Sequence, residues 1–212
     1  MATEFLVRGN LRPEQLPEFM RRPLDAGEQV LVIGGGDTSM DCVRTAVRLG
    51  AKEVTCCYRR TEAEQLGRLE ERVHAREEGV RFEYLAAPLR FEAGPAGQVA
   101  RVYFGRMALG EPDESGRRRP VPTGEEFAVE AGTVVIAIGY HADEELAESA
   151  GIEHNKDLIV APPPTFETSR PGVFAGGDCV NGADLVVTAL ADARGAAEAI
   201  HAYLMEQIEA AA

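Results

Sequence analysis

Two glycines and a serine are spaced so that they could bind the pyrophosphate of a dinucleotide. The sequence has Gly34-x-Gly36-x-x-Ser39, with Gly35 at the first variable position. A pyrophosphate requires a tight turn, a backbone without side chains at the contact, and a helix N-terminus directed at it. Gly34 suits the turn, Gly36 permits close approach, and Ser39 is small enough for close packing of helix on strand. The alternative is a tight turn that uses glycine for structural reasons alone.

A pair of arginines occupies the position that distinguishes the two nicotinamide cofactors. About 20 residues beyond the glycines, an NAD site usually has an acidic residue that binds the ribose 2′-hydroxyl. This sequence has Arg59 and Arg60 there, after Tyr58. Guanidinium groups would pair with a 2′-phosphate and could stack on the adenine. The pattern therefore favours NADPH over NADH, with a solvated pair of surface charges as the alternative.

Two later glycine-containing turns are weaker candidates. Gly139 ends an apolar run at the sheet edge where ligands of open α/β sheets bind, although buried strands commonly end in glycine. In Gly176-Gly177-Asp178, the glycines would let a phosphate or ribityl chain approach, and the acid could bind hydroxyls. An ordinary turn is the alternative. The helix expected after Leu185 begins with free N–H groups that could face an electron-rich carbonyl.

A parallel sheet is needed to position these residues, and the sequence predicts one. Residues 29–33 and 54–58 are apolar or β-branched runs typical of buried strands, and residues 80–85 continue the pattern. Apolar residues at helical spacing over 40–49 and a charged helical segment over 69–78 separate them. The alternation predicts an α/β, Rossmann-like fold with right-handed crossovers.

The second half of the chain has a different pattern. Residues 88–131 contain short alternating segments between glycine- and proline-containing turns, which predict an antiparallel β-meander with Arg117-Arg118-Arg119 at an exposed hairpin tip. A buried strand at 133–138 follows. A short strand at 173–175 and an alanine-rich helix at 185–205 are expected to close the chain.

Composition excludes several classes of function. The chain has 212 residues, with 22 basic against 35 acidic side chains and a formal charge of −13. This charge repels nucleic acid and anionic membranes. The cysteines and histidines lack the spacing of metal ligands, no apolar run approaches the ~18 residues that span a bilayer, and no signal peptide is evident. We therefore expect a reduced, cytoplasmic protein without a metal site.

In combination these motifs resemble a known family. The segments at 30–46, 54–60, 75–80 and 174–178 are similar to the small (β) subunits of NADPH-dependent glutamate synthases and to related flavin oxidoreductases, including the electron-input part of dihydropyrimidine dehydrogenase. The resemblance covers nearly the whole chain. It implies a pyridine nucleotide-disulfide oxidoreductase-like protein in which NADPH, bound on one Rossmann-like domain, passes hydride to FAD held by another.

The resemblance also implies domains and site residues. Residues 1–28 would be a lead-in, 29–140 the NADPH-binding domain, and 141–212 the strand–helix return segment of an FAD-type domain. For NADPH, the resemblance implies contacts of the pyrophosphate and ribose with Gly34, Gly35, Gly36, Asp37 and Thr38. It implies Arg59 and Arg60 at the 2′-phosphate and Gly139 near the nicotinamide half. For FAD, it implies Gly177 and Asp178, with the backbone of Val186 or Val187 near the flavin. Asp37 could equally be a helix-start residue.

Three hypotheses follow from these patterns. The family's segment with iron–sulfur clusters and the FAD glycine motif has no counterpart in these residues, so we expect FAD to bind with a partner or a further segment that carries them. The chain would then be the NADPH-binding part of a flavin oxidoreductase, without a catalytic acid or base of its own. Alternatively, it is a non-catalytic nucleotide-binding or assembly subunit. A free-standing NADP-dependent dehydrogenase is disfavoured because no tyrosine precedes a lysine by four residues.

Overall fold

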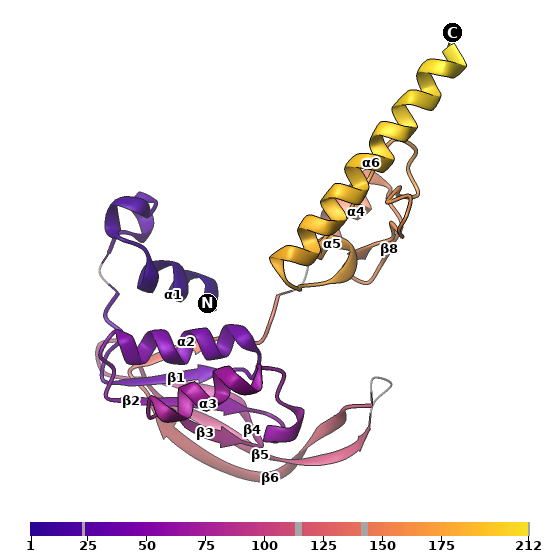
Figure 1. Cartoon of the computed structure of the whole chain (residues 1–212). Helices are drawn as coiled ribbons and strands as arrows, with labels where there is room; N and C mark the ends of the chain where they lie inside the picture. Colours follow the sequence, from indigo (N-terminus) through magenta and orange to yellow (C-terminus); the bar gives the residue numbers. More distant parts are fainter. Residues whose placement is uncertain (23, 113–115, 141–143, 212) are drawn as a thin grey trace. The chain divides into compact units, whose positions relative to one another are not determined.

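The computed structural model describes residues 1–22, 24–112, 116–140 and 144–211 (Figure 1). The chain divides into two compact units, Met1–Gly139 and Tyr140–Ala212. Residues 1–22 and 24–28 belong to the first unit, where the helix α1 (Ala2–Asn10) packs on the next helix along the chain. The functional division at residues 28 and 140 stays a prediction.

A four-stranded parallel sheet is the centre of the first unit. Its strands are β1 (Gln29–Ile33), β2 (Glu53–Tyr58), β3 (Arg81–Tyr84) and β7 (Thr133–Ile136), in the order β3-β2-β1-β7. Adjacent strands are parallel throughout. The predicted Rossmann-like sheet is confirmed, with β3 and β7 slightly shorter than the sequence predicts.

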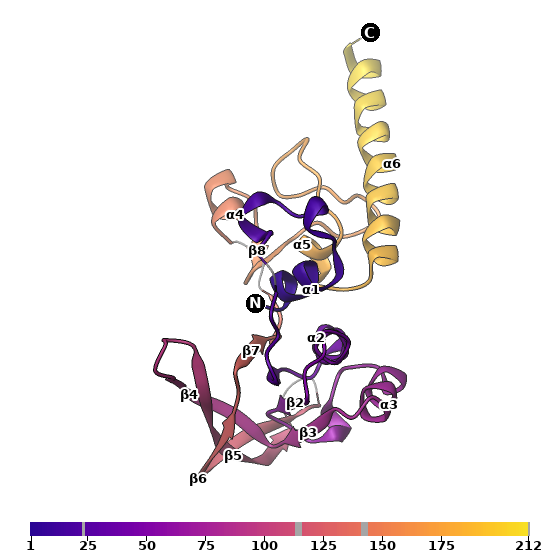
Figure 2. The ribbon, with the colours of Figure 1, turned by 90° about the vertical axis from the view of Figure 1, so that its left-hand side faces the viewer.

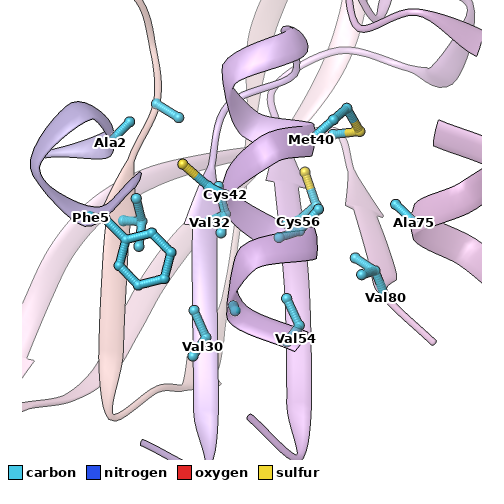
Figure 3. Close-up of a cluster of buried hydrophobic side chains, with 14 of the residues drawn as sticks. Ala2, Phe5, Val30, Val32, Met40, Cys42, Val54, Cys56, Ala75 and Val80 are labelled. Atoms are coloured by element: carbon cyan, nitrogen blue, oxygen red, sulfur yellow. The ribbon is translucent and has the colours of Figure 1, made fainter. Parts of the chain in front are cut away.

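Helices cover one face of this sheet. The crossovers contain α2 (Asp37–Arg48) and α3 (Leu69–Glu77), and short 3-10 turns occur at Pro13–Gln15, Glu18–Met20 and Glu62–Glu64. The face of α2 that carries Met40 and Val43 is fully buried against β1 and β2. Figure 3 shows this core, with Cys42 of α2 beside Val32 of β1. The apolar spacing in the sequence therefore marks the packed face of α2.

An antiparallel sheet covers the opposite face, as the meander predicts. Its strands are β4 (Ala86–Ala93), β5 (Val99–Pro112) and β6 (Arg118–Glu130), in the order β4-β5-β6. A second core forms between the two sheets, where Phe104 of β5 packs with Leu31 of β1. The first unit thus has three layers, with helices, parallel sheet and antiparallel sheet in succession (Figures 1 and 2).

The second unit has less regular structure. Its elements are α4 (Glu144–Ala150), β8 (His154–Asn155), β9 (Leu158–Ile159), α5 (Asp178–Asn181) and α6 (Val186–Ala211). The strand expected at 173–175 consists of a single bridge from Phe174 to Glu167, because no longer partner strand lies beside it within the described residues. In Figure 2, α6 extends well beyond the rest of this unit. No helix within the described ranges is long and apolar enough to cross a membrane.

Candidate nucleotide-binding site

The glycine-rich turn after β1 is held tightly between its neighbours. Gly34 has φ +148°, and a Cβ atom there would lie 2.1 Å from the carbonyl oxygen of Ala137. The Gly34 N–H donates to the Cys57 carbonyl at 3.0 Å, and the Cys56 thiol donates to the Gly34 carbonyl at 3.3 Å. A side chain at Gly34 would displace this backbone, so the fold itself requires glycine at this position.

The next two glycines have different surroundings. At Gly35, a Cβ would lie 2.5 Å from the ring of Tyr58, so this glycine makes room for the aromatic side chain. At Gly36, a Cβ would meet nothing within 4 Å, and its φ of −91° is open to any residue. The protein's own packing therefore explains Gly34 and Gly35 but gives no reason for glycine at position 36.

Helix α2 begins directly at this turn and presents free backbone donors. Gly36 is its N-cap, and no side chain caps the helix. Ser39 and Met40 donate their N–H groups to the Gly36 carbonyl, whereas those of Asp37 and Thr38 have no hydrogen-bond partner among the described residues. The Ser39 hydroxyl donates to the Ala137 carbonyl at 3.3 Å. Unpaired N–H groups and the positive end of the helix dipole make an anion site here.

The carboxylate of Asp37 is engaged with the protein. It accepts the Arg68 N–H at 2.9 Å and pairs with the Arg68 guanidinium at 3.3 Å. The adjacent Gly67 N–H donates to the Gly35 carbonyl at 2.8 Å, so the segment before α3 lies against the glycine turn. Asp37 is the first residue of α2, and the role of Asp37 and Thr38 at the nucleotide stays a prediction. Arg68 is mostly exposed and brings a positive charge to the turn that sequence reasoning did not single out.

The two arginines after β2 have different environments. Arg59 is exposed, and no hydrogen bond or ion pair joins its side chain to another described residue. Arg60 is only 6% exposed, and its Nε donates to the carbonyl of Arg118 at 2.8 Å. The 2′-phosphate role of both stays a prediction, and Arg59 is the more accessible of the two.

Arg117, directly before β6, reaches the end of β2, whereas an exposed hairpin tip was expected at this position. Arg118 and Arg119 are exposed, but Arg117 is half-buried and donates to the Tyr58 hydroxyl at 3.1 Å. The Tyr58 hydroxyl in turn donates to the Glu64 carbonyl at 2.9 Å. Sequence reasoning missed this neighbour of the site because the strands that bring Arg117 to Tyr58 pair only in the folded sheet. The run of three arginines was the available signal.

Gly139 follows β7 and is the last residue of the first unit. Its φ is +100°, and a Cβ there would meet open space. The N–H of Ala137 donates to the Ile33 carbonyl at 2.8 Å, which continues the pairing beyond β7 on the side of the glycine turn. The backbone conformation explains the glycine, and its proximity to a nicotinamide stays a prediction.

In the second unit, an acid from α6 holds the Gly-Gly-Asp turn. Gly177 has φ +77° and caps α5, and its N–H donates to Asp192 at 2.9 Å. Asn181 donates to the same carboxylate at 2.6 Å. Asp178 is exposed, and its carboxylate makes no hydrogen bond within the described ranges. No motif singles out Asp192, which fixes this turn from 14 positions beyond Asp178.

The first residues of α6 are also accessible. Val186 and Val187 are 76% and 68% exposed, and their N–H groups have no partner in the part of the chain that the structure describes. Thr188 and Ala189 donate to the Leu185 carbonyl, which marks the first helical turn. The start of α6 therefore has the unpaired donors that the sequence predicts.

The cysteines supply no nucleophile to the first unit. Burial raises the pKa of Cys42 and of Cys56 to about 12, and raises the pKa of Cys57 as well. These thiols stay protonated near neutral pH and pack as small apolar groups. Among the described residues, no group of three His, Cys, Asp or Glu side chains could hold a metal ion.

A Rossmann-like sheet with a glycine turn, a helix N-terminus and basic residues after its second strand defines a nucleotide-binding α/β protein. The model of the family "Pyridine nucleotide-disulphide oxidoreductase" matches residues 6–193, and the chain belongs to this family. A pyridine nucleotide and FAD, the cofactors expected from the sequence, follow from this membership.

Named relatives confirm the resemblance. The chain is 47% identical over 184 residues to the glutamate synthase [NADPH] small chain of Escherichia coli (strain K12), with 84% of this chain and 39% of that protein covered. It is 45% identical over 207 residues to the putative oxidoreductase AegA of the same organism, covering 94% and 31%. The chain thus spans well under half the length of these two relatives.

A solved structure shows the same fold. Thioredoxin reductase of Lactococcus lactis in its FR conformation matches with a TM-score of 0.69 at 23% identity, over 84% of this chain and 53% of that one. At this identity the likeness concerns architecture alone. It confirms the fold class of parallel and antiparallel sheets.

Proposed function

We propose that this chain is the NADPH-binding module of a flavin-dependent oxidoreductase of the glutamate synthase small-subunit type, in which hydride passes from NADPH to FAD. The observation that carries the proposal is Gly36. Neither packing nor backbone conformation requires glycine there, yet it lies beside the N–H groups of Asp37 and Thr38, which no described residue pairs. A pyrophosphate that approaches this backbone supplies the missing reason.

Selection of NADPH rests on the residues that follow β2. Arg59 is an exposed arginine without an ion pair among the described residues, although the chain as a whole is strongly acidic. A guanidinium forms paired, charge-assisted hydrogen bonds with a phosphate monoester. We propose that Arg59 is the main residue that binds the 2′-phosphate. Arg60 would contribute only if its buried side chain moved.

The second unit has features that fit FAD. The Asp178 carboxylate, next to the buried Gly177, is exposed and available to hydroxyl groups, and the N–H groups of Val186 and Val187 are unpaired within the described residues. Bound FAD would supply the acceptor for the hydride of NADPH. Hydride transfer needs positioning of the two rings rather than an acid or base, so the role of this chain is to bind and orient.

A second candidate is a non-catalytic nucleotide-binding or assembly subunit whose second unit docks on a partner that carries the FAD half. The apolar side chains along α6 favour it, because Leu190, Leu204 and Ile208 are all more than half exposed. The greater length of the relatives leaves room for such a partner or segment, including one with iron–sulfur clusters. We also propose a cytoplasmic location, which the free thiols of all four cysteines support.

The first test is a titration of the chain with NADPH and with NADH, in which intrinsic or nucleotide fluorescence reports binding. We expect NADPH to bind at least about tenfold more tightly than NADH, since one charge-assisted contact contributes about 1.5–3 kcal/mol. Arg59→Ala should abolish most of this preference and leave NADH binding unchanged. Equal affinity for the two nucleotides in the wild-type chain would refute the assignment.

The second test separates the two candidates. The purified chain is mixed with FAD, and the visible spectrum is recorded before and after addition of NADPH under anaerobic conditions. Stoichiometric flavin that NADPH bleaches supports the hydride-transfer module. A chain that binds NADPH but retains no flavin agrees with FAD held by a partner or a further segment. The same spectra are then recorded with that FAD-carrying half added, where bleaching by NADPH supports the hydride-transfer module and its absence favours the assembly subunit.

A further inference from the structure

The extended ends of β5 and β6 are attached to the carboxyl end of β2. Pro112 at the end of β5 pairs with Arg118 at the start of β6. From this ribbon, the Arg117 guanidinium donates to the Tyr58 hydroxyl at 3.1 Å and to the Glu64 carbonyl at 3.4 Å. The Arg118 carbonyl accepts from Arg60 Nε at 2.8 Å. Three hydrogen bonds thus bring a distant part of the chain to the residues expected to distinguish NADPH from NADH.

This attachment brings a further arginine to the end of β2. Arg59 and Arg60 follow β2 in a chain of net charge −13, and Arg117 contacts Tyr58 at the end of the same strand; these three residues are here called the arginine cluster. Glu64 lies nearby, but its carboxylate accepts from the hydroxyl and N–H of Thr61, and those bonds lower its pKa. A phosphate group that reached these guanidinium groups would form charge-assisted hydrogen bonds with them.

Tyr58 connects the arginine cluster to the glycine turn. Its buried ring lies so close to Gly35 that a Cβ there would be 2.5 Å away, while its hydroxyl accepts from Arg117. The two ends of one side chain therefore touch the pyrophosphate turn and the arginine. In a dinucleotide fold, the adenosine lies between the glycine turn and the end of the second strand. Arg117 is consequently on the adenosine side of the site.

We propose that Arg117 is a specificity-determining residue that, together with Arg59, binds the 2′-phosphate of NADPH. The inference rests on the proposed function and extends it to a residue outside the dinucleotide motif. It assigns the β5–β6 ribbon a part in selecting the nucleotide, beyond its role in covering the sheet. A ligand without the 2′-phosphate gains nothing from Arg117.

A purely structural role for Arg117 makes a different prediction. If its hydrogen bonds to Tyr58 and Glu64 only attach the ribbon, its loss would disturb the site in the same way for every nucleotide. Binding of NADPH and NADH would then weaken together. The ratio of the two affinities is therefore the decisive quantity, because a structural disturbance does not change it.

The experiment measures Kd for NADPH, NADH and adenosine 2′,5′-bisphosphate by calorimetry on the whole chain. Arg117→Ala is compared with Arg119→Ala, which removes the same charge from an exposed neighbour whose side chain makes no hydrogen bond or ion pair with another described residue. We expect Arg117→Ala to weaken NADPH and the bisphosphate about tenfold or more and NADH less than twofold. Arg119→Ala should leave all three within twofold. Arg117→Lys should restore part of the loss, because it keeps the charge without the fork.

Each result has a definite meaning. Unchanged NADPH binding in Arg117→Ala, or equal weakening of NADPH and NADH, overturns the inference, and circular dichroism identifies a variant that has not folded. If Arg117→Ala does not fold, Tyr58→Phe is measured in its place. This variant removes only the hydroxyl that accepts from Arg117 and donates to the Glu64 carbonyl. The inference then requires that Tyr58→Phe weakens NADPH more than NADH. A wild-type chain that binds no NADPH refutes the proposed function itself. If Arg59→Ala loses NADPH affinity and Arg117→Ala does not, the role of Arg117 is refuted and the proposed function stands.

Discussion

The two units bury their apolar residues to very different degrees. In the first, the side chains of Val32, Met40 and Cys56 have no exposed surface, and two cores lie on the two faces of one sheet. In the second, α6 has 26 residues, of which only Ala196 is buried among those described. Burial of one large aliphatic side chain contributes about 1.5–3 kcal/mol. The first unit therefore has the means to hold its own site rigid, whereas α6 gains little stabilisation from burial within the second unit.

The two glycine turns differ in the same way. The Ala137 backbone and the Ser39 hydroxyl lie where a Gly34 side chain would begin, and hydrogen bonds to β2 fix this turn. The turn at Gly177 is held chiefly by the carboxylate of Asp192, and a Cβ there would be 3.4 Å from Ala189. The comparison indicates that the backbone of the first unit holds the turn after β1, whereas a side chain of α6 holds the second turn, although Gly177 is buried there as well.

Thiol labelling tests the contrast in burial and has the largest expected effect. At pH 8, a thiol of pKa about 12 is ionised in about one molecule in ten thousand. A thiol reagent should therefore modify the exposed Cys179 at least about a thousandfold faster than Cys42 or Cys56. Counting modified thiols by mass spectrometry should give one in the native protein and four in denaturant. Cys179→Ser is the control, and rapid native labelling of this variant would contradict the contrast.

Paired glycine substitutions test the difference between the two turns. Gly34→Ala should destabilise the first unit by about 3 kcal/mol or more, since the new Cβ collides with backbone at 2.1 Å and φ is positive. Gly177→Ala meets no collision, so only its backbone strain of about 1–2 kcal/mol remains. Urea unfolding followed by circular dichroism measures both. Equal losses, or a larger loss at Gly177, would show that the two turns do not differ as described.

A third substitution tests whether the open glycine serves the ligand rather than the fold. Gly36→Ala should change the free energy of unfolding by no more than about 1 kcal/mol, because its Cβ enters open space at an N-cap. It should weaken NADPH about tenfold by obstructing the pyrophosphate. Fluorescence titration measures this affinity, with Glu198→Gln on the exposed surface of α6 as a control that leaves it unchanged. Unaltered binding by Gly36→Ala would remove the main support for the pyrophosphate site.

Sequence patterns were sufficient for the elements of the first unit. A strand buried on both faces needs a continuous apolar run, and an amphipathic helix needs apolar residues at helical spacing, so β1 and α2 follow from local composition. The turn between them needs glycine at Gly34 for reasons of backbone conformation. The same patterns were less informative for the second unit, where the segment expected as a strand at 173–175 forms only a single β-bridge, between Phe174 and Glu167. A strand depends on a partner, and sequence alone does not supply one.

The composition and spacing of the residues determined that this chain has a Rossmann-like first unit with a glycine turn and arginines after its second strand. Only the tertiary structure decided which of those side chains are accessible. It buries Arg60 against the Arg118 carbonyl, leaves Arg59 exposed, and brings Arg117 to Tyr58. The physical reason is that local sequence governs backbone conformation and apolar periodicity, whereas contacts between distant segments depend on the register of β5 with β6 and on the packing of one sheet against the other.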